Sequence, residues 1–333
     1  METRKVQLSG GSTYIVSIPK KWARKVGISS GSSLNIMEDR NGNLILSPGP
    51  LTSRESVDGE IKLTGKEGPD AIMRRLVGAY VSGVTSLVVT SNGSIPPELA
   101  RVVREFTRLV MGVEIVEERK DLIRLQDLID PADFSLRTGL KRMAYITEKM
   151  VEDSLIGLKD PGNMMLDDVV LRDMEVDRIN WLIHKEYNML SMYPRMSEKA
   201  NISTEDALNY MISSRLVERV ADHAVSMARY MQMRESFEDP SLINAIHREG
   251  MKAKKIFTDS VVSLLSREMD LADRVIDDAR EQSSSLQPLM KKVFKLPSDE
   301  AVILAYVLNS LERIGAYGAD IGKITLNTYV RRT

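Results

Sequence analysis

The sequence predicts a multidomain protein in which a small β domain and a small α/β sandwich precede an all-α region of tandem three-helix bundles. Three observations carry this prediction. The chain of 333 residues is longer than a single compact core usually holds. Strand-like segments with glycine-containing turns are concentrated before Pro131. After Pro131, long segments with helically spaced apolar residues take over.

The composition excludes several classes of protein. Hydrophobic residues make up 43% and charged residues 28%, which is ordinary for a globular chain. No apolar run approaches the roughly 18 residues of a membrane span, and the start METRKVQLSGG lacks the apolar core of a secretory signal. We therefore expect a cytoplasmic protein without membrane insertion. Because there is no cysteine, disulfides, thiolate zinc sites, iron–sulfur clusters and cysteine nucleophiles are excluded.

The charge is distributed unevenly along the chain. Residues 1–50 hold seven Lys/Arg against three Asp/Glu, a balance of +4, so the overall −1 leaves −5 for residues 51–333. A basic head on a mildly acidic body suggests a polyanionic partner at the N-terminus. A basic surface that only contacts solvent is the alternative, and charge alone does not separate the two.

Residues 1–50 are expected to form the small β domain. The predicted elements are strands at Arg4–Leu8 and Tyr14–Ile18 around Gly10–Gly11, a short helix from Pro19 to Gly27, and strands at Ser33–Glu38 and Leu44–Ser47 around Asn41–Gly42. So short a segment buries little surface alone, so we expect it to form an intertwined homodimer.

Residues 51–130 are expected to form a small α/β domain of order βαβαββ. The predicted elements are a strand at Glu60–Leu63, a helix at Pro69–Ser82, a strand at Ser86–Thr90, a helix that starts at Pro96–Pro97, and strands at Val113–Glu117 and Leu122–Leu125. Neither GxGxxG nor GxxxxGK[ST] occurs in the chain, so no phosphate-binding loop is predicted.

The rest of the chain is expected to be helical, apart from strand-type composition in its last ten residues. Helices are predicted at 136–159, 164–192, 203–236, 241–268, 269–295 and 298–322. These six resemble three helices used twice. MVEDSLIGL (150–158) is echoed by IFTDSVVSL (256–264), LDDVVLRDMEVD (166–177) by LADRVIDDAREQ (271–282), and LVERVADHAVSM (216–227) by LERIGAYGADI (311–321). The repeat predicts bundles at 131–236 and 237–333.

Two carboxylate pairs in the first bundle are candidates for a metal site. Asp173 and Asp177 are four residues apart, as are Glu218 and Asp222, so each pair shares one helix face, where like charges repel. Hard oxygen ligands on two helices suit a multivalent cation. His184 lies on the same stripe as Asp173, within about 20°. The alternative is salt bridges, with Arg172, Arg178 or Arg219 as partners.

The motifs around these carboxylates resemble those of the PhoU family of phosphate-uptake regulators. The segments that carry the resemblance are ERVADHAVSMA at 218–228 and DMEVD at 173–177. The resemblance covers about residues 136–325 and implies two three-helix bundles. It also implies that Asp173, Asp177, Glu218 and Asp222 ligate iron or zinc, which purified protein can lack, and that phosphate-transporter components such as the transport ATPase are partners. His223 follows the family pattern but is expected to bond a neighbour rather than a metal.

The second bundle departs from this pattern. Gln282 stands where Asp177 does in the first bundle, and Ala316 stands where Asp222 does. Asp278 and Glu312 remain, so two of four carboxylates are lost. Because charge count sets much of the affinity of a cation site, we expect metal in the first bundle and a weaker site or none in the second.

The N-terminal segment TYIVSIPKKWARKVGISSGSSLNI resembles the swapped-hairpin domains of the AbrB, MazE and SpoVT families. The resemblance implies that two chains interleave into one β barrel and that basic residues contact DNA, although some members only dimerise. The basic residues of this segment are suited to neutralising phosphates. They are Arg4, Lys5, Lys20, Lys21, Arg24 and Lys25.

Together these features predict a homodimeric, DNA-binding transcriptional regulator of phosphate uptake that carries a metal-binding bundle. One alternative is an adaptor associated with a transporter, in which the barrel is a dimer clamp that never touches DNA. Another is a metal-dependent hydrolase. The hydrolase is disfavoured because no nucleophile and base accompany the carboxylates, so we expect no enzymatic activity.

Overall fold

The computed structural model describes residues 2–38, 42–48, 57–129, 134–193 and 200–329. The chain divides into two compact units, residues 1–55 and residues 56–333, which are described separately here. The second unit holds both the sheet domain and all the long helices. No helix of the described residues is long and apolar enough to cross a membrane.

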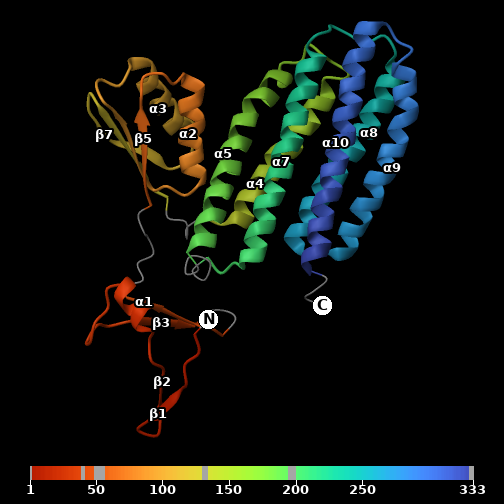
Figure 1. The fold of residues 1–333 in the computed structure, drawn as a ribbon. Helices are drawn as coiled ribbons and strands as arrows, with labels where there is room; N and C mark the ends of the chain where they lie inside the picture. Colours follow the sequence, from red (N-terminus) through yellow and green to blue (C-terminus); the bar gives the residue numbers. More distant parts are fainter. Residues whose placement is uncertain (1, 39–41, 49–56, 130–133, 194–199, 330–333) are drawn as a thin grey trace. The chain divides into compact units, whose positions relative to one another are not determined.

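The first unit consists of two hairpins and a short helix (Figure 1). Its elements are β1 (Gln7–Ser9), β2 (Thr13–Ile15), α1 (Lys20–Lys25), β3 (Asn35–Glu38) and β4 (Leu44–Ser47). Strands β1 and β2 pair antiparallel, as do β3 and β4. Gly10 and Gly11 turn the first hairpin with φ of 59° and 79°, a region that favours glycine. The predicted turn at Asn41–Gly42 lies partly outside the described residues.

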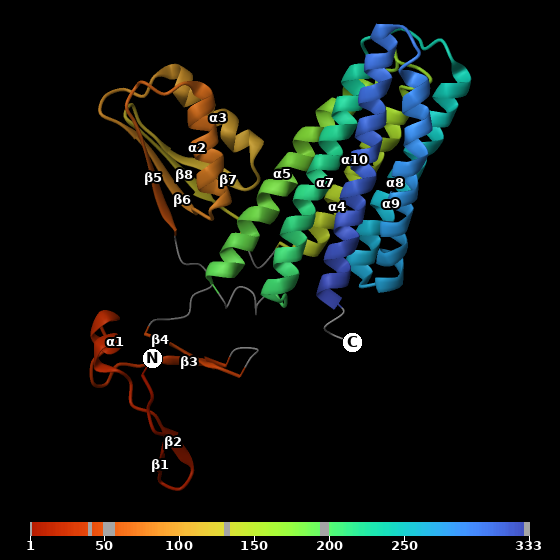
Figure 2. The ribbon, with the colours of Figure 1, turned by 45° about the vertical axis from the view of Figure 1, so that its right-hand side comes forward.

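The second unit begins with a four-stranded sheet covered by two helices. The elements are β5 (Asp58–Leu63), α2 (Pro69–Val81), β6 (Ser86–Ser91), α3 (Pro97–Leu109), β7 (Val113–Glu118) and β8 (Leu122–Asp127). The strand order is β5-β6-β8-β7, with β5 and β6 parallel and the other pairs antiparallel. Figure 2 shows α2 and α3 on one side of the sheet. Burial alternates along β8, as expected when one face is covered.

Six long helices complete the unit as two adjoining bundles. The helices of the first are α4 (Leu136–Ile156), α5 (Met165–Met192) and α7 (Thr204–Met231), and those of the second are α8 (Pro240–Ser266), α9 (Met269–Val293) and α10 (Ser298–Tyr329). α7 also packs on α10 and α4 on α8, and one continuous apolar core runs through both bundles. Ser135, Ser203 and Asp239 cap α4, α7 and α8 with side-chain oxygens.

The described C-terminal residues correct the predicted end of the last helix, despite their strand-type composition. α10 continues to Tyr329, beyond the predicted end at residue 322. Thr325 and Thr328 donate their hydroxyls to Ile321 and Ile324 carbonyls, at 3.1 and 2.6 Å. Both threonines are buried against neighbouring helices. Tertiary burial and these bonds override the β preference of the segment.

The junction between the bundles generates a stability prediction. A Cβ added at Gly250 of α8 would lie 2.3 Å from Leu155 Cδ2 of α4. Gly250→Ala should therefore destabilise the fold by about 1–3 kcal/mol, because overpacking forces neighbouring side chains to move. Gly78→Ala is the matched control, since nothing lies within 4 Å of its added Cβ. That control should be neutral or stabilising by about 0.5–1 kcal/mol, as for alanine in a helix. Urea unfolding checks both; equal behaviour of the two variants would contradict the close packing.

Candidate metal centre and nucleic-acid interface

Antiparallel packing of α5 on α7 brings the four predicted carboxylates together. Asp173 lies near Asp222 and lines the same pocket, and the charge of Glu218 acts on Asp177. One turn further, Ser214 Oγ donates to Asn180 Oδ1 at 2.9 Å and ties the helices together in a buried position. We call Asp173, Asp177, Glu218 and Asp222 the carboxylate cluster. The sequence did not identify Ser214, although the small polar pair Ser213–Ser214 one turn before Glu218 is a usable signal.

The carboxylate cluster is half-buried, and this raises the pKa values of its members. Burial, followed by the charges of Asp173, Glu218 and Asp222, raises the pKa of Asp177 to about 7. Burial and then Asp222 raise the pKa of both Asp173 and Glu218, and burial raises that of Asp222. Two causes thus act in the same direction, desolvation and repulsion between like charges. A cation among the carboxylates would relieve both.

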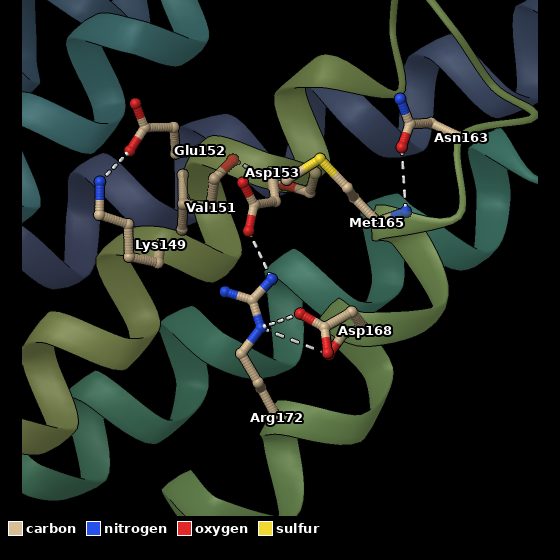
Figure 3. A network of polar contacts seen from close by, with 9 residues as sticks. Lys149, Val151, Glu152, Asp153, Asn163, Met165, Asp168 and Arg172 are labelled. Atoms are coloured by element: carbon tan, nitrogen blue, oxygen red, sulfur yellow. Dashed lines mark hydrogen bonds and ion pairs between the residues drawn. The ribbon is translucent and has the colours of Figure 1, made fainter.

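The three arginines considered as salt-bridge partners differ in their surroundings, and the buried Nε of Arg178 has no hydrogen-bond partner among the described residues. Figure 3 shows the Arg172 guanidinium between Asp153 and Asp168, with its Nε 2.9 Å from Asp168 Oδ2. Arg219 lies over the Tyr317 ring, 5.8 Å from its centroid. Within the described part of the chain, no lysine or arginine nitrogen lies within 4.0 Å of the carboxylate cluster. The described residues thus show no direct ion pair with the carboxylate cluster, although the charge of Arg219 opposes the rise in the pKa values of Glu218 and Asp222.

The donors of the carboxylate cluster suit a metal, but they are not arranged as a coordination shell. Asp173 Oδ1 is buried without a hydrogen-bond partner among the described residues. Uncompensated carboxylate oxygens fit a hard or borderline cation. However, no group of three or more His, Asp or Glu side chains among the described residues stands in metal-ligating geometry. A metal would therefore require the carboxylates to converge.

The two histidines near the carboxylate cluster are placed differently. Burial and then Arg215 lower the pKa of His184 to about 4, and its buried Nε2 has no hydrogen-bond partner among the described residues. None of the four carboxylates contributes to that shift, so the structure does not join His184 to them. His223 Nδ1 lies 3.2 Å from Ser310 Oγ in α10, as expected for a histidine that bonds a neighbour.

In the second bundle, an amide occupies the position equivalent to Asp177. Gln282 is buried, and its Nε2 donates to the Leu311 carbonyl at 3.1 Å. The amide packs on Gly315, where an added Cβ would lie 2.0 Å from Gln282 Oε1. Glu312 accepts a hydrogen bond from Ser283 Oγ at 2.7 Å, and Asp278 is exposed. The two remaining carboxylates are thus neither buried nor crowded.

The basic residues of the first unit are exposed. Four lie on α1 and two precede β1; they are Lys20, Lys21, Arg24, Lys25, Arg4 and Lys5. Arg4 contacts Glu2. No described residue of this unit is buried, and several large apolar side chains are more than half exposed, among them Tyr14 at 76% and Leu44 at 69%. A unit without a core of its own needs a partner to cover these side chains.

The second unit combines a sheet domain with two adjoining three-helix bundles, and part of it matches known proteins. Residues 140–231 match the PhoU domain, and residues 7–52 match the bacterial antitoxin domain MazE. The chain is 23% identical over 205 residues to the phosphate-specific transport system accessory protein PhoU homolog of Clostridium acetobutylicum, covering 57% of this chain and 89% of that protein. The family resemblance read from the motifs is therefore confirmed: the chain carries a PhoU domain behind a MazE-type N-terminal domain.

Solved structures show the same helical fold. The crystal structure of PhoU from Pseudomonas aeruginosa matches with a TM-score of 0.53 and 21% identity, over 60% of this chain and 96% of that one. The phosphate transport system regulatory protein PhoU from Streptococcus pneumoniae matches with a TM-score of 0.51 and 14% identity, over 59% and 93%. At this identity the likeness establishes the fold.

The raised pKa of Asp177 generates a prediction for chelator-treated protein. The folded-state pKa of about 7 exceeds the ordinary value of 3.8, so the folded protein holds this proton more tightly than the unfolded chain. Stability should then fall as the pH rises from about 4 to 7. Asp177→Asn should stabilise the metal-free protein at pH 8 by about 1–2 kcal/mol, discounted for solvent screening, with the gain shrinking toward pH 4.

Urea unfolding at several pH values measures this difference. The control is Asp278→Asn, because Asp278 is exposed and should give the wild-type profile. Parallel pH profiles for wild type and Asp177→Asn would show that Asp177 carries no excess repulsion.

Proposed function

We propose that this protein is a cytoplasmic, homodimeric regulator of phosphate uptake that binds promoter DNA through its N-terminal unit and a metal ion through the carboxylate cluster. The observation that carries the proposal is the presence of a PhoU domain and a MazE-type domain in one chain. A regulator needs one part that responds to the transport state and another that acts on a target. The two matched domains would divide these tasks.

The link to phosphate transport rests on the matched relatives. One is named as an accessory protein of a phosphate-specific transport system, and another as a phosphate transport regulatory protein. Carried over to this chain, the names suggest that the bundles contact a component of a phosphate transporter, such as its ATPase. No nucleophile and base accompany the carboxylates, so the proposed activity is binding and not catalysis.

DNA binding and dimerisation are supported by the first unit. Residues 1–50 carry a balance of +4, and their Lys and Arg side chains that are described are exposed. Exposed cations neutralise phosphates, and uncovered apolar strands favour an intertwined second copy of the same unit. A competing function, a transporter adaptor that only dimerises through this unit, is favoured by the same apolar strands. Binding to DNA separates the two.

The metal is proposed to lie between α5 and α7. Asp173 and Asp177 would hold it from α5, and Glu218 and Asp222 from α7. Their mutual repulsion and raised pKa values support a cation in this position, with iron or zinc the expected ion. Bound there, the ion would supply positive charge that joins two helices of one bundle. The second bundle offers two carboxylates and an amide hydrogen-bonded to Leu311, so we expect little or no binding there.

Metal content tests this asymmetry. In Asp177→Asn/Asp222→Asn, affinity should fall by more than about 100-fold, because even residues that only support a ligand are worth 10- to 100-fold. Asp278→Asn/Glu312→Gln in the second bundle is the matched control and should keep wild-type content. Elemental analysis after loading with iron(II) or zinc, with chelator-treated samples alongside, gives the comparison. Equal content in both double variants would place the ion elsewhere, and metal-free wild type after loading would overturn the proposed site.

The salt dependence of DNA binding tests the N-terminal unit. Each phosphate-contacting cation that is removed should flatten the slope of log K against log salt by about one unit. Arg4→Ala/Lys5→Ala/Arg24→Ala should therefore lower the slope by about three per chain and nearly abolish binding to any DNA. The control removes three exposed cations of the second unit, Lys66→Ala/Arg74→Ala/Arg101→Ala, and should bind normally. Fluorescence anisotropy with promoter fragments provides the readout. If wild type binds no DNA at low salt, the adaptor function is favoured.

A further inference from the structure

The sheet domain is fastened to one helix of the first bundle, α5. Asn188 Nδ2 donates to the Val81 carbonyl at 2.7 Å. Met189 packs closely on Gly83, because a Cβ added at Gly83 would lie 2.6 Å from the Sδ of Met189. Leu182 is a member of the apolar core beneath the sheet, and Trp181 packs against that core. α2 is the helix of the sheet domain that packs on α5 (Figure 1).

A buried set of charges lies at the centre of this contact. Lys185 Nζ of α5 lies 2.6 Å from Asp127 Oδ2 at the end of β8 and 3.4 Å from Glu186 Oε1. The ammonium also lies over the Tyr80 ring of α2, 4.9 Å from its centroid. All three charged side chains are at most 2% exposed. We call Lys185, Asp127 and Glu186 the Lys185 latch.

The Lys185 latch resists sliding of the sheet domain along α5. Separation of a buried ammonium from its carboxylate leaves two desolvated charges, which is strongly unfavourable. Tyr80 restricts the geometry further, since its hydroxyl donates to the Met111 carbonyl at 3.0 Å. The sheet domain and the second half of α5 should therefore move as one body.

The same helix carries half of the carboxylate cluster. Asp177 and Lys185 are eight residues apart on an uninterrupted helix, about 12 Å at 1.5 Å per residue. The carboxylates are close enough to repel, yet no metal-ligating group is formed among the described residues. A cation therefore has to draw α5 and α7 closer. The sheet domain holds the later turns of α5 through the Lys185 latch, about 80° around the helix from Asp177.

We propose that the sheet domain is a coupling module: through the Lys185 latch it holds α5 in register for cation binding at the carboxylate cluster, and cation binding in turn tightens the sheet domain on α5. This inference rests on the metal site proposed above and gives residues 57–129 a role in its regulation. Coupling between two sites is reciprocal. Docking of the sheet domain on α5 should therefore favour cation binding by the same factor by which cation binding favours docking.

The test uses the full-length protein and zinc ion alone. In the latch variant Lys185→Met/Asp127→Asn/Glu186→Gln, the charges are replaced by side chains of similar volume, which preserves packing. The matched control variant is Lys254→Met/Glu148→Gln/Glu152→Gln. It removes the same number of charges from a more exposed cluster between α4 and α8, in which Lys254 Nζ lies 3.8 Å from Glu148 and 3.5 Å from Glu152. Calorimetry measures zinc affinity, and hydrogen exchange measures protection in α2 and β8.

In wild type, zinc should slow exchange in α2 and β8, and the latch variant should lose that protection. Its zinc affinity should be weaker by roughly fivefold or more, the lower end of ordinary coupling between sites. The control variant should keep both the affinity and the protection.

Zinc binding to wild type without any change in α2 or β8 overturns the coupling and leaves the metal site standing. That comparison needs no variant, so it holds even if the latch variant does not fold. Unchanged affinity in a folded latch variant also overturns the coupling. Absence of zinc binding to wild type overturns the metal site and the coupling with it.

Discussion

Antiparallel packing of α5 on α7 is the constraint on which the candidate site depends. In the sequence, the carboxylates form two separate pairs. The two members of each pair share one helix face and repel one another weakly. Packing places the pairs opposite one another and removes much of their solvent, which raises the pKa of Asp177 to about 7. The Asn180–Ser214 hydrogen bond holds this arrangement one turn away. The apolar core beneath the cluster thus holds the two helices together although their carboxylates repel one another.

α5 is the helix through which the domains of the second unit meet. Its face toward α7 carries Asp173 and Asp177, and its later turns carry Lys185 and Met189 toward the sheet domain. Two domains of one chain are usually connected by a flexible linker, and the interface between them is usually rather polar. Here buried charges and apolar side chains join them along one helix. The carboxylates and the sheet-domain contacts therefore lie on one continuous helix, which is the physical basis of the proposed coupling.

The two bundles share a repeated sequence pattern but differ in their chemistry. Gln282 is neutral, hydrogen-bonds to the Leu311 carbonyl and fills the space over Gly315. An amide can remain buried without a cation, whereas a carboxylate in the same place is costly. The second bundle can therefore pack as a permanent structural support. The first bundle keeps four half-buried carboxylates whose pKa values are raised.

The sequence by itself determined the local structure and the candidate ligands. Turn glycines, helix-initiating prolines and apolar periodicity act over a few residues, and they placed nearly every strand and helix. The i,i+4 spacing of the carboxylates and the family motifs identified the cluster and the loss of its counterpart at Gln282. Tertiary structure decided the rest. Whether Arg172 would pair with Asp173 or with Asp153, and whether Lys185 would face solvent or Asp127, depended on packing. Those partners are many residues apart in the chain, and an ion pair forms only where packing brings two charges together and excludes water from them.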